Sequence, residues 1–415
     1  MPESCLYITL SNQQDVYAPG SLIEGVAHLD LEEDIKARAL KITMEGRAHT
    51  CWSKQRTRTV SRTHTETYRE KYSATVIYAN DERMAWMSPA GAKEILPAGS
   101  YQFPFVFNLP LNLPPSFEGY YGYIRYVVKM ELDRPWRFNK RNQKAFTVVP
   151  VFDLNTIPRA ILPVKDLKVK KLGIILFRHG EVTLECETSK GGFVPGEMVV
   201  VKARIVNDSS KDIVKAQLKL VEISSYVAYR MFRTLPPSYF IKTAGFHERH
   251  QQRRTLATGE QDLFIAKNSK GDVQLYLQVP PTVPSFDCCP IIKVEYMVEL
   301  KFESTGSVNS NIDTTLPIII GTIPILRSAP RDEASSSSTF HPTAPPLELE
   351  DPPEYPAGSS AVETVLPPSY EDSVNGIDGT TIDKDDIEPY VPRYPFFRQL
   401  SEVHEKAADG NSSRL

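Results

Sequence analysis

The sequence predicts an all-β protein with two tandem immunoglobulin-like β-sandwich domains and a disordered, proline-rich acidic tail. Three observations carry this prediction. Apolar and polar residues alternate along short segments that end in Pro and Gly turns, the second half repeats motifs of the first, and the composition changes after Leu326. A length of 415 residues is sufficient for two domains and a tail.

The first half reads as strands with one buried face. From Ile124 to Leu132 every second residue is apolar, and three of the four residues between them are charged. Successive side chains of a strand point to opposite faces, so this alternation is typical of a half-buried strand. Ile23 to Leu31 and Leu40 to Gly46 show the same pattern. Helical patterns are scarce, and Asp81 to Leu96 is expected to hold one short helix at most.

The second half repeats the first, which indicates two copies of one sandwich. Three pairs of segments correspond: Tyr17-Ala18-Pro19-Gly20 with Phe193-Val194-Pro195-Gly196, Ile35 to Ile42 with Ile213 to Leu220, and Ser116-Phe117 with Ser285-Phe286. We therefore expect a first sandwich over residues 1–155, a second over 170–326 and a tail over 327–415. The short link, roughly Asn155 to Lys171, favours one elongated body.

Charge is unevenly distributed along the chain. From Arg327 onward there are 17 acidic and 7 basic residues, whereas the preceding part carries 34 acidic and 41 basic residues. A mildly basic body with an acidic tail is compatible with contact to anionic lipid or phosphorylated peptides.

The cysteines and the apolar runs indicate the cellular compartment in which the protein is expected to lie. There are five cysteines without Cys-x-x-Cys spacing, which favours a reducing environment and neither a disulfide framework nor a zinc ribbon. The start of the chain lacks the pattern of a secretory signal. The most apolar run, Leu316 to Leu326, is too short to span a bilayer, so membrane association is expected to be peripheral.

Two Pro-Pro-x-Tyr motifs lie in the tail. They comprise Pro352, Pro353 and Tyr355, and Pro367, Pro368 and Tyr370. Paired prolines fix φ and favour polyproline II, and the tyrosine adds one rigid anchor. WW domains, which have aromatic grooves, bind such segments. The alternative is a linker that happens to contain Pro and Tyr.

Two further peptide motifs give weaker indications of partner binding. Pro342, Thr343, Ala344 and Pro345 resemble the P(T/S)AP signal read by the ESCRT-I complex, and the alternative is a stiff linker. Leu235 to Tyr239 contains a third Pro-Pro-x-Tyr match, but its apolar surroundings favour a loop or edge turn of a folded domain over a ligand.

A basic stretch between Arg47 and Lys71 is expected to form a hairpin. Such a face would meet acidic cargo tails or anionic lipid, or would simply be solvated. Nucleic acid is not expected, because no recognition fold or stacking platform accompanies it. The candidate contact residues are Arg47, Lys54, Arg56, Arg58 and Arg62.

No pattern in the sequence predicts catalysis, a metal site or a cofactor. Phosphate loops, nucleophile elbows and H-E-x-x-H are absent from it. His247 and His250 lie among basic residues, where a solvated polar loop is favoured over a metal site. We therefore expect a protein that is not an enzyme.

Several longer stretches resemble the α-arrestins, the arrestin domain-containing proteins. The matching segments are His49-Thr50-Cys51-Trp52, Leu96 to Pro110, Ser116 to Gly119, Ile124 to Trp136, Phe286 to Tyr296 and Leu316 to Pro324. The resemblance implies arrestin-type sandwiches in an adaptor that brings WW-domain HECT-class ubiquitin ligases to membrane receptors or transporters. Such an adaptor would be cytoplasmic and recruited to the plasma membrane and endosomes. The buried charged cluster of visual and β-arrestins has no counterpart that the sequence reveals, so phosphate-triggered activation is not carried over.

Rival functions remain open at this point. A vesicle-budding scaffold would use Pro342 to Pro345 to recruit ESCRT-I, a redox regulator would use its cysteines, and a retromer-like coat would need no Pro-Pro-x-Tyr tail. A separate question concerns the aromatic segment Tyr390 to Phe397, which would either pair back onto a sheet edge of the body or serve as a further peptide ligand.

Overall fold

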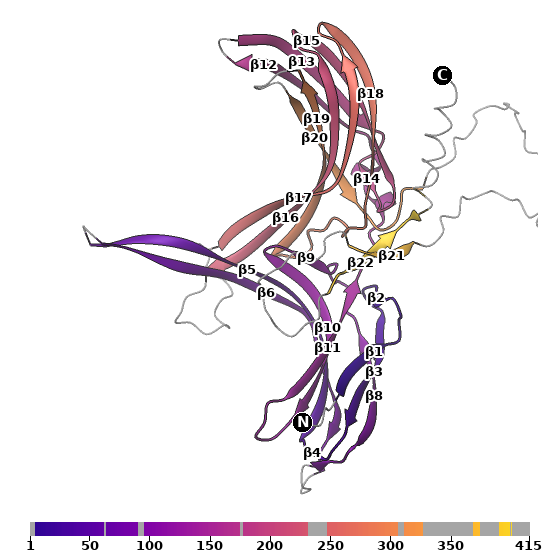
Figure 1. Ribbon diagram of the computed structural model, residues 1–415. Helices are drawn as coiled ribbons and strands as arrows, with labels where there is room; N and C mark the ends of the chain where they lie inside the picture. Colours follow the sequence, from indigo (N-terminus) through magenta and orange to yellow (C-terminus); the bar gives the residue numbers. More distant parts are fainter. Residues whose placement is uncertain are drawn as a thin grey trace, which may run out of the picture.

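Strands make up almost all of the regular structure in the computed structural model (Figure 1). The model describes residues 5–61, 64–89, 95–174, 177–230, 247–305, 311–326, 368–373, 390–398 and 400. Two sandwiches lie one above the other in Figure 1, and two long hairpins project from the junction on the same side. The all-β prediction with two sandwich domains is confirmed.

The first sandwich packs a three-stranded sheet against a larger one. Alternation places Ile23, Ala27 and Leu29 in its core without exposed surface, opposite Ile42 and Val128 of the other sheet. The three-stranded sheet contains β1 (Cys5–Leu10), β3 (Leu22–Leu31) and β8 (Gly99–Asn108). The larger sheet contains β2 (Val16–Tyr17), β5 (Ala39–Ser61), β6 (His64–Met87), β9 (Phe117–Gly119), β10 (Gly122–Asp133) and β11 (Lys140–Val148), and β4 (Ile35–Lys36) pairs with β7 (Ile95–Leu96).

The second sandwich repeats this arrangement. Its four-stranded sheet contains β12 (Val164–Ile174), β13 (Phe177–Thr188), β15 (Met198–Ser209) and β18 (Ser269–Gln278). The opposing strands are β14 (Gly192–Phe193), β16 (Ile213–Arg230), β17 (His247–Ile265), β19 (Ile292–Ser304) and β20 (Ile312–Ile320).

The internal repeat extends to individual hydrogen bonds. Ser116 donates its N–H to the carbonyl of Val148, and its hydroxyl oxygen accepts the N–H of Val148 at 2.9 Å. Ser285 makes the same pair of bonds with Ile320, at 2.8 and 3.0 Å. The short strands β2 and β14 also occupy equivalent places, because each pairs in parallel with the last long strand of its sandwich.

The two sandwiches are joined by strand pairing and aromatic packing. The last two residues of β16, Tyr229 and Arg230, pair with β6, and the Thr50 hydroxyl donates to the Val227 carbonyl at 2.7 Å. Phe117 packs against Tyr226 and Phe286 with ring centroids 6.4 and 5.9 Å away. A Cβ on Gly119 would lie 2.1 Å from the Tyr226 hydroxyl, so the close approach of the domains requires glycine there.

Asp81 to Leu96 was expected to hold one short helix at most, and its described residues form none, because β6 continues to Met87 and pairs with β5. One local expectation is wrong. The polar loop expected at His247 is instead the start of β17. The helical turns η1 (Leu154–Thr156) and α1 (Pro158–Ile161) lie in the connection between the domains.

Candidate functional site

The tail motifs are only partly covered by the structure. Pro342 to Pro345, Pro352 to Tyr355 and Pro367 lie outside the described residues, as does the third match at Leu235 to Tyr239. Of the second tail motif, Pro368 and Tyr370 are described. This motif is therefore the one whose surroundings are known.

The second motif runs directly into a strand. β21 (Ser369–Asp372) pairs antiparallel with β22 (Arg393–Phe396), so that Tyr370 lies opposite Pro395. Two exposed ion pairs flank this ribbon, Arg393 with Asp372 at 3.0 Å and Arg398 with Glu371 at 2.8 Å. Exposed pairs contribute little to stability, so the ribbon needs other anchors.

The aromatic segment Tyr390 to Phe397 docks in the seam, by which we mean the junction between the two sandwiches. Figure 1 shows β22 entering between β2 and β9 of the first domain and β14 of the second. The Tyr394 side chain is 1% exposed, and its hydroxyl donates to the Ser116 carbonyl at 2.7 Å. The segment thus docks, but it pairs with β21 of the tail and with no sheet edge of the body.

Tyr394 lies near carboxylates from both domains. Burial raises the pKa of its phenol, and the neighbouring Tyr390, Glu222 and Glu118 act in the same direction. Glu118 belongs to β9 and Glu222 to β16. Because the phenol stays protonated at physiological pH, it remains a donor to Ser116.

A second anchor lies three residues further along. Phe397 is buried in a small cluster with Leu154, Ala160 and Val194, and its N–H donates to the Pro195 carbonyl at 3.0 Å. Leu154 and Ala160 come from the interdomain connection and Val194 from the second domain. Docking of Phe397 therefore ties the tail to the interdomain connection and to the second sandwich.

The half-buried side chain of Tyr390 contacts the first domain. Its hydroxyl lies 2.8 Å from the Thr147 hydroxyl, which also accepts the N–H of Arg393 at 3.2 Å. The Arg393 guanidinium reaches the Gln14 carbonyl at 3.3 Å. These bonds fix the direction in which the tail segment enters the seam.

An apolar groove of about 380 Å³ lies beside the docked ribbon. Both tail strands contribute to its wall through Tyr370 and Pro395, and the body contributes residues from the two domains and their connection. Two apolar residues of the two domains that line the groove, Val151 and Leu326, are 71% and 63% exposed.

A buried ion pair adjoins the seam and was missed by sequence reasoning. Arg125 donates to both carboxylate oxygens of Glu118, at 2.6 and 2.9 Å, and its guanidinium lies 3.8 Å from the centre of the Tyr123 ring. Burial raises the pKa of the Glu118 carboxyl, and Arg125 opposes that shift. Nothing in the sequence singles out Arg125, because Lys129, Glu131 and Asp133 of the same strand are also charged.

The candidate basic residues lie on a hairpin, as expected, but the described ones have carboxylate partners. Lys54 and Arg56 both reach Glu248 of β17, at 2.7 and 3.2 Å. Arg58 pairs with Glu66 at 2.7 Å. Arg62 lies outside the described residues. Ion pairs from β5 to β17 thus connect the hairpin of β5 and β6 with the hairpin of β16 and β17.

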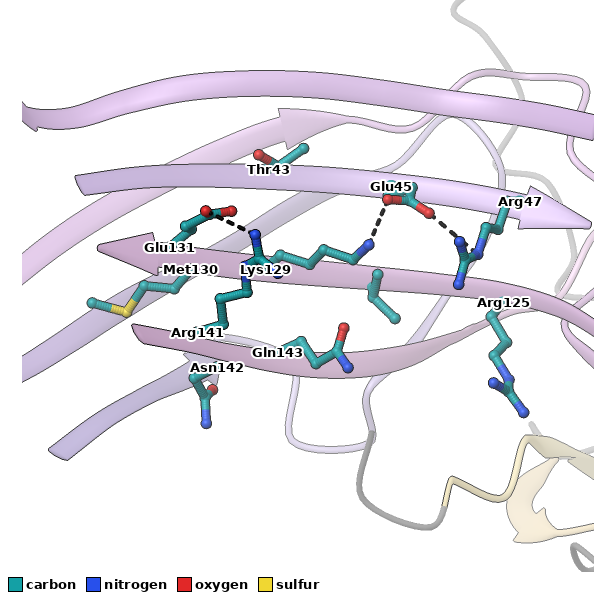
Figure 2. Close-up of a pocket in the computed structure, with 11 residues that line it drawn as sticks. Thr43, Glu45, Arg47, Arg125, Lys129, Met130, Glu131, Arg141, Asn142 and Gln143 are labelled. Carbon is teal, nitrogen blue, oxygen red and sulfur yellow. Dashed lines mark hydrogen bonds and ion pairs between the residues drawn. The ribbon is translucent and has the colours of Figure 1, made fainter. Parts of the chain in front are cut away.

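Arg47 points to a different surface. It lies with Glu45 and Lys129 in an open depression of about 410 Å³ on β5, β10 and β11 (Figure 2). Glu45 pairs with Lys129 at 2.6 Å and with Arg47 at 3.3 Å. The described basic residues therefore do not form one continuous face, since Arg47 lies in this depression and Lys54 and Arg56 lie against β17. We assign no site to the depression.

Two further observations concern the described residues only. No group of three or more His, Cys, Asp and Glu side chains in them is arranged to hold a metal ion. Among those residues, no helix has the length and hydropathy needed to cross a bilayer.

The paired sandwiches, the seam and the docked tail define an arrestin-type protein. Family models for the N-terminal and C-terminal domains of arrestin (or S-antigen) match residues 6–155 and 178–325. The chain belongs to the family of arrestin domain-containing proteins, the α-arrestins.

Three relatives illustrate the similarity. Arrestin domain-containing protein 17 of Caenorhabditis elegans is 31% identical over 337 residues, which is 77% of this chain and 70% of the relative. Arrestin domain-containing protein 4 of Homo sapiens is 29% identical over 383 residues, 91% of this chain and 81% of the relative. Arrestin domain-containing protein 1 of Mus musculus is 28% identical over 350 residues, 82% and 71% of the two chains.

Proposed function

We propose that the chain is a non-catalytic adaptor that recruits WW-domain HECT-class ubiquitin ligases to membrane-protein cargo. Recruitment promotes ubiquitination, endocytosis and endosomal sorting of receptors or transporters. The observation that carries this proposal is the presence of two Pro-Pro-x-Tyr motifs in the acidic tail of a double arrestin sandwich. In this view the sandwiches over residues 1–155 and 170–326 contact cargo, and residues 327–415 supply the ligase contacts.

Avidity makes the weak single motifs effective. One such peptide in one WW groove binds at a micromolar scale of about −7 to −8 kcal/mol. About a dozen residues separate Tyr355 from Pro367, which gives a flexible span near 20 Å. A ligase with tandem WW domains engages both motifs and gains roughly 10- to 1000-fold in affinity.

A pulldown from cytosol with the full chain tests the proposal. The native chain is expected to retain a WW-containing ligase, and the chain with Tyr355→Ala and Tyr370→Ala is expected to lose it. Glu354→Ala, at the variable position of the first motif, is the matched control and retains the ligase. If the double variant holds as much ligase as the native chain, these motifs are not the ligase contacts.

The location follows from this function. We propose a cytoplasmic protein that is recruited to the plasma membrane and endosomes by peripheral association. Arg47, Lys54, Arg56, Arg58 and Arg62 are the candidate cargo or lipid contacts. Arg56 and Arg58 are 48% and 65% exposed, so both remain accessible beside their carboxylate partners. Flotation with vesicles that contain or lack anionic lipid, for the native chain and for Arg56→Gln with Arg58→Gln, tests this contact.

A second candidate function rests on Pro342 to Pro345. Here the chain is a vesicle-budding scaffold, in which this tetrapeptide recruits ESCRT-I and the ligase motifs supply ubiquitin as a budding signal. Release of the protein itself in small vesicles, lost after Pro345→Ala and kept after Thr339→Ala, would favour this function. Unchanged release after Pro345→Ala would remove it.

A further inference from the structure

Two residues of the second motif, Ser369 and Tyr370, lie in a strand that is paired with another part of the tail. Pro-Pro-x-Tyr ligands bind as polyproline II helices, with the proline and tyrosine rings presented to an aromatic groove. In this structure Ser369 and Tyr370 belong to β21, and the Ser369 hydroxyl donates to the Phe396 carbonyl at 3.2 Å. The strand that holds the motif is thus already paired with the chain itself.

The tyrosine of the motif also has part of its surface covered. Tyr370 is 36% exposed and lines the apolar groove together with Pro368, Pro395 and Phe397. A WW domain buries this tyrosine ring as its main anchor. It therefore needs the ring to leave the groove, which separates β21 from β22.

The strand that pairs with the motif is held firmly by the body. Tyr394 and Phe397 are 1% and 6% exposed, and they point into different clusters. The Tyr394 hydroxyl and the Phe397 N–H each bond to a backbone carbonyl of a different domain. Burial of two aromatic side chains is the main source of stability for the docked tail.

The turn at Gly196 of the second domain lies directly against this segment. Gly196 has φ of +95°, and a Cβ there would lie 2.5 Å from the Phe397 carbonyl oxygen. The equivalent turn of the first domain, at Gly20, has φ of +83° but faces only the flexible Leu111 side chain. The second-domain turn thus contacts the tail backbone directly, which its counterpart does not do.

We propose that the seam is an intramolecular peptide-binding site for Tyr390 to Phe397, and that its occupation withholds the motif Pro367 to Tyr370 from WW domains. Ligase binding at this motif and its pairing with β22 exclude each other. The proposal rests on the proposed function, because it assumes that this motif is a WW ligand. Its consequence is that binding at the second motif separates β21 from β22, while Tyr394 and Phe397 hold β22 in the seam.

The first test measures affinity in a chain with a single working motif. Tyr355→Ala leaves the second motif, and a single purified WW domain that binds Pro-Pro-x-Tyr peptides is the probe. This chain is expected to bind about 10-fold more weakly than a peptide of residues 362–373. That factor corresponds to a motif that is released from β22 in about one tenth of the molecules. Adding Tyr394→Ala and Phe397→Ala is expected to restore the affinity of the peptide.

A truncated chain guards against misfolding of the anchor variants. A Tyr355→Ala chain that ends at Thr380 keeps the second motif and lacks the docking segment, and it is expected to bind as tightly as the peptide. Equal affinity of the peptide, the Tyr355→Ala chain and the truncated chain would overturn the proposal. Failure of the peptide itself to bind would overturn it together with the proposed function, and is recognised by the peptide measurement alone.

The second test observes the pairing of the two tail strands by hydrogen exchange. The Ser373 N–H donates to the Pro392 carbonyl at 2.9 Å, so the Ser373 amide reports this pairing. In the Tyr355→Ala chain, a saturating WW domain is expected to abolish protection of the Ser373 amide. In a Tyr370→Ala chain, which keeps only the first motif, the same WW domain is expected to leave that protection unchanged. Full protection of the Ser373 amide at saturation in the Tyr355→Ala chain would show that the motif can be bound while β21 is paired with β22, and would overturn the proposal.

Discussion

The hydroxyl of Tyr394 donates a 2.7 Å hydrogen bond to the carbonyl oxygen of Ser116, 278 residues earlier in the chain. Ser116 also bonds twice to Val148, at the end of the first sandwich. The same serine therefore connects the start of β9 to the end of β11 in the first domain, and it also binds the tail. Its counterpart Ser285 makes the equivalent pair of bonds with Ile320 in the second domain.

Tyr394→Phe is expected to weaken tail docking by about 1 kcal/mol, the usual net contribution of one hydrogen bond. Tyr394→Ala removes the buried ring as well, and the cost rises to about 3–5 kcal/mol. The measurement is the exchange rate of the Phe397 amide, whose protection reports docking. Phe138→Ala, at a side chain that is 93% exposed, is the control and leaves the rate unchanged. Equal rates in the Phe and Ala variants would contradict the role of the ring.

Gly196→Ala is expected to release the tail. The substitution strains the backbone by about 1–2 kcal/mol, because φ is +95° there. It also places a methyl group 2.5 Å from the Phe397 carbonyl oxygen. Gly20→Ala is the matched control, since it carries similar strain and faces only a flexible side chain. Both variants should unfold at lower denaturant, and only Gly196→Ala should deprotect the Phe397 amide. Retained protection in that variant would be the contrary result.

Arg125→Met is expected to lower the free energy of unfolding by about 3–5 kcal/mol, because Glu118 is left as a buried charge without its partner. Adding Glu118→Leu should recover most of the loss. Chemical denaturation of the single and double variants checks this. Arg58→Met, from an exposed pair, should change stability little. If the double variant is less stable than Arg125→Met, the buried pair is not the source of the loss.

The contact between the two hairpins is expected to weaken on acidification. His250 packs edge-on against Trp52 at 4.6 Å and tilted against Tyr121 at 4.7 Å, and burial, together with Lys54, lowers its pKa, while Glu248 opposes that shift. A depressed pKa in the folded state means that the stabilisation is complete above pH 6.5 and is lost as the pH falls through the folded-state pKa.

Thermal unfolding between pH 7.5 and 5.5 measures this loss. His250→Phe keeps an aromatic ring and has no charge to gain, so its unfolding temperature should fall less over the same range. An identical fall in both proteins would assign the pH dependence to other groups.

Period-two patterning and repeated turns predicted the architecture well. Both signals are local, since the alternation in Ile124 to Leu132 and the Pro-Gly turns at Gly20 and Gly196 depend on residues within a few positions. The strand at Asp81 to Met87 was not predicted, because its pairing with β5 overrides its weak local pattern.

The candidate site was predicted only in part. The Pro-Pro-x-Tyr spacing identified the second motif, but its pairing with β22 depends on two anchors, Tyr394 and Phe397, whose burial is set by residues hundreds of positions away. Tyr390 to Phe397 shows no alternation of apolar and polar residues that would mark a buried face. The Glu118–Arg125 pair was missed for a different reason. The two residues are only seven positions apart, but it is the antiparallel pairing of β9 with β10 that brings their side chains together.

The most direct test of the adaptor function is a titration of the full chain with a purified ligase fragment that carries two WW domains. The native chain is expected to bind at least 10-fold more tightly than either Tyr355→Ala or Tyr370→Ala, and binding should be lost when both are combined. If the combined variant binds the ligase fragment as tightly as the native chain does, the claim that the tail motifs recruit the ligase is contradicted.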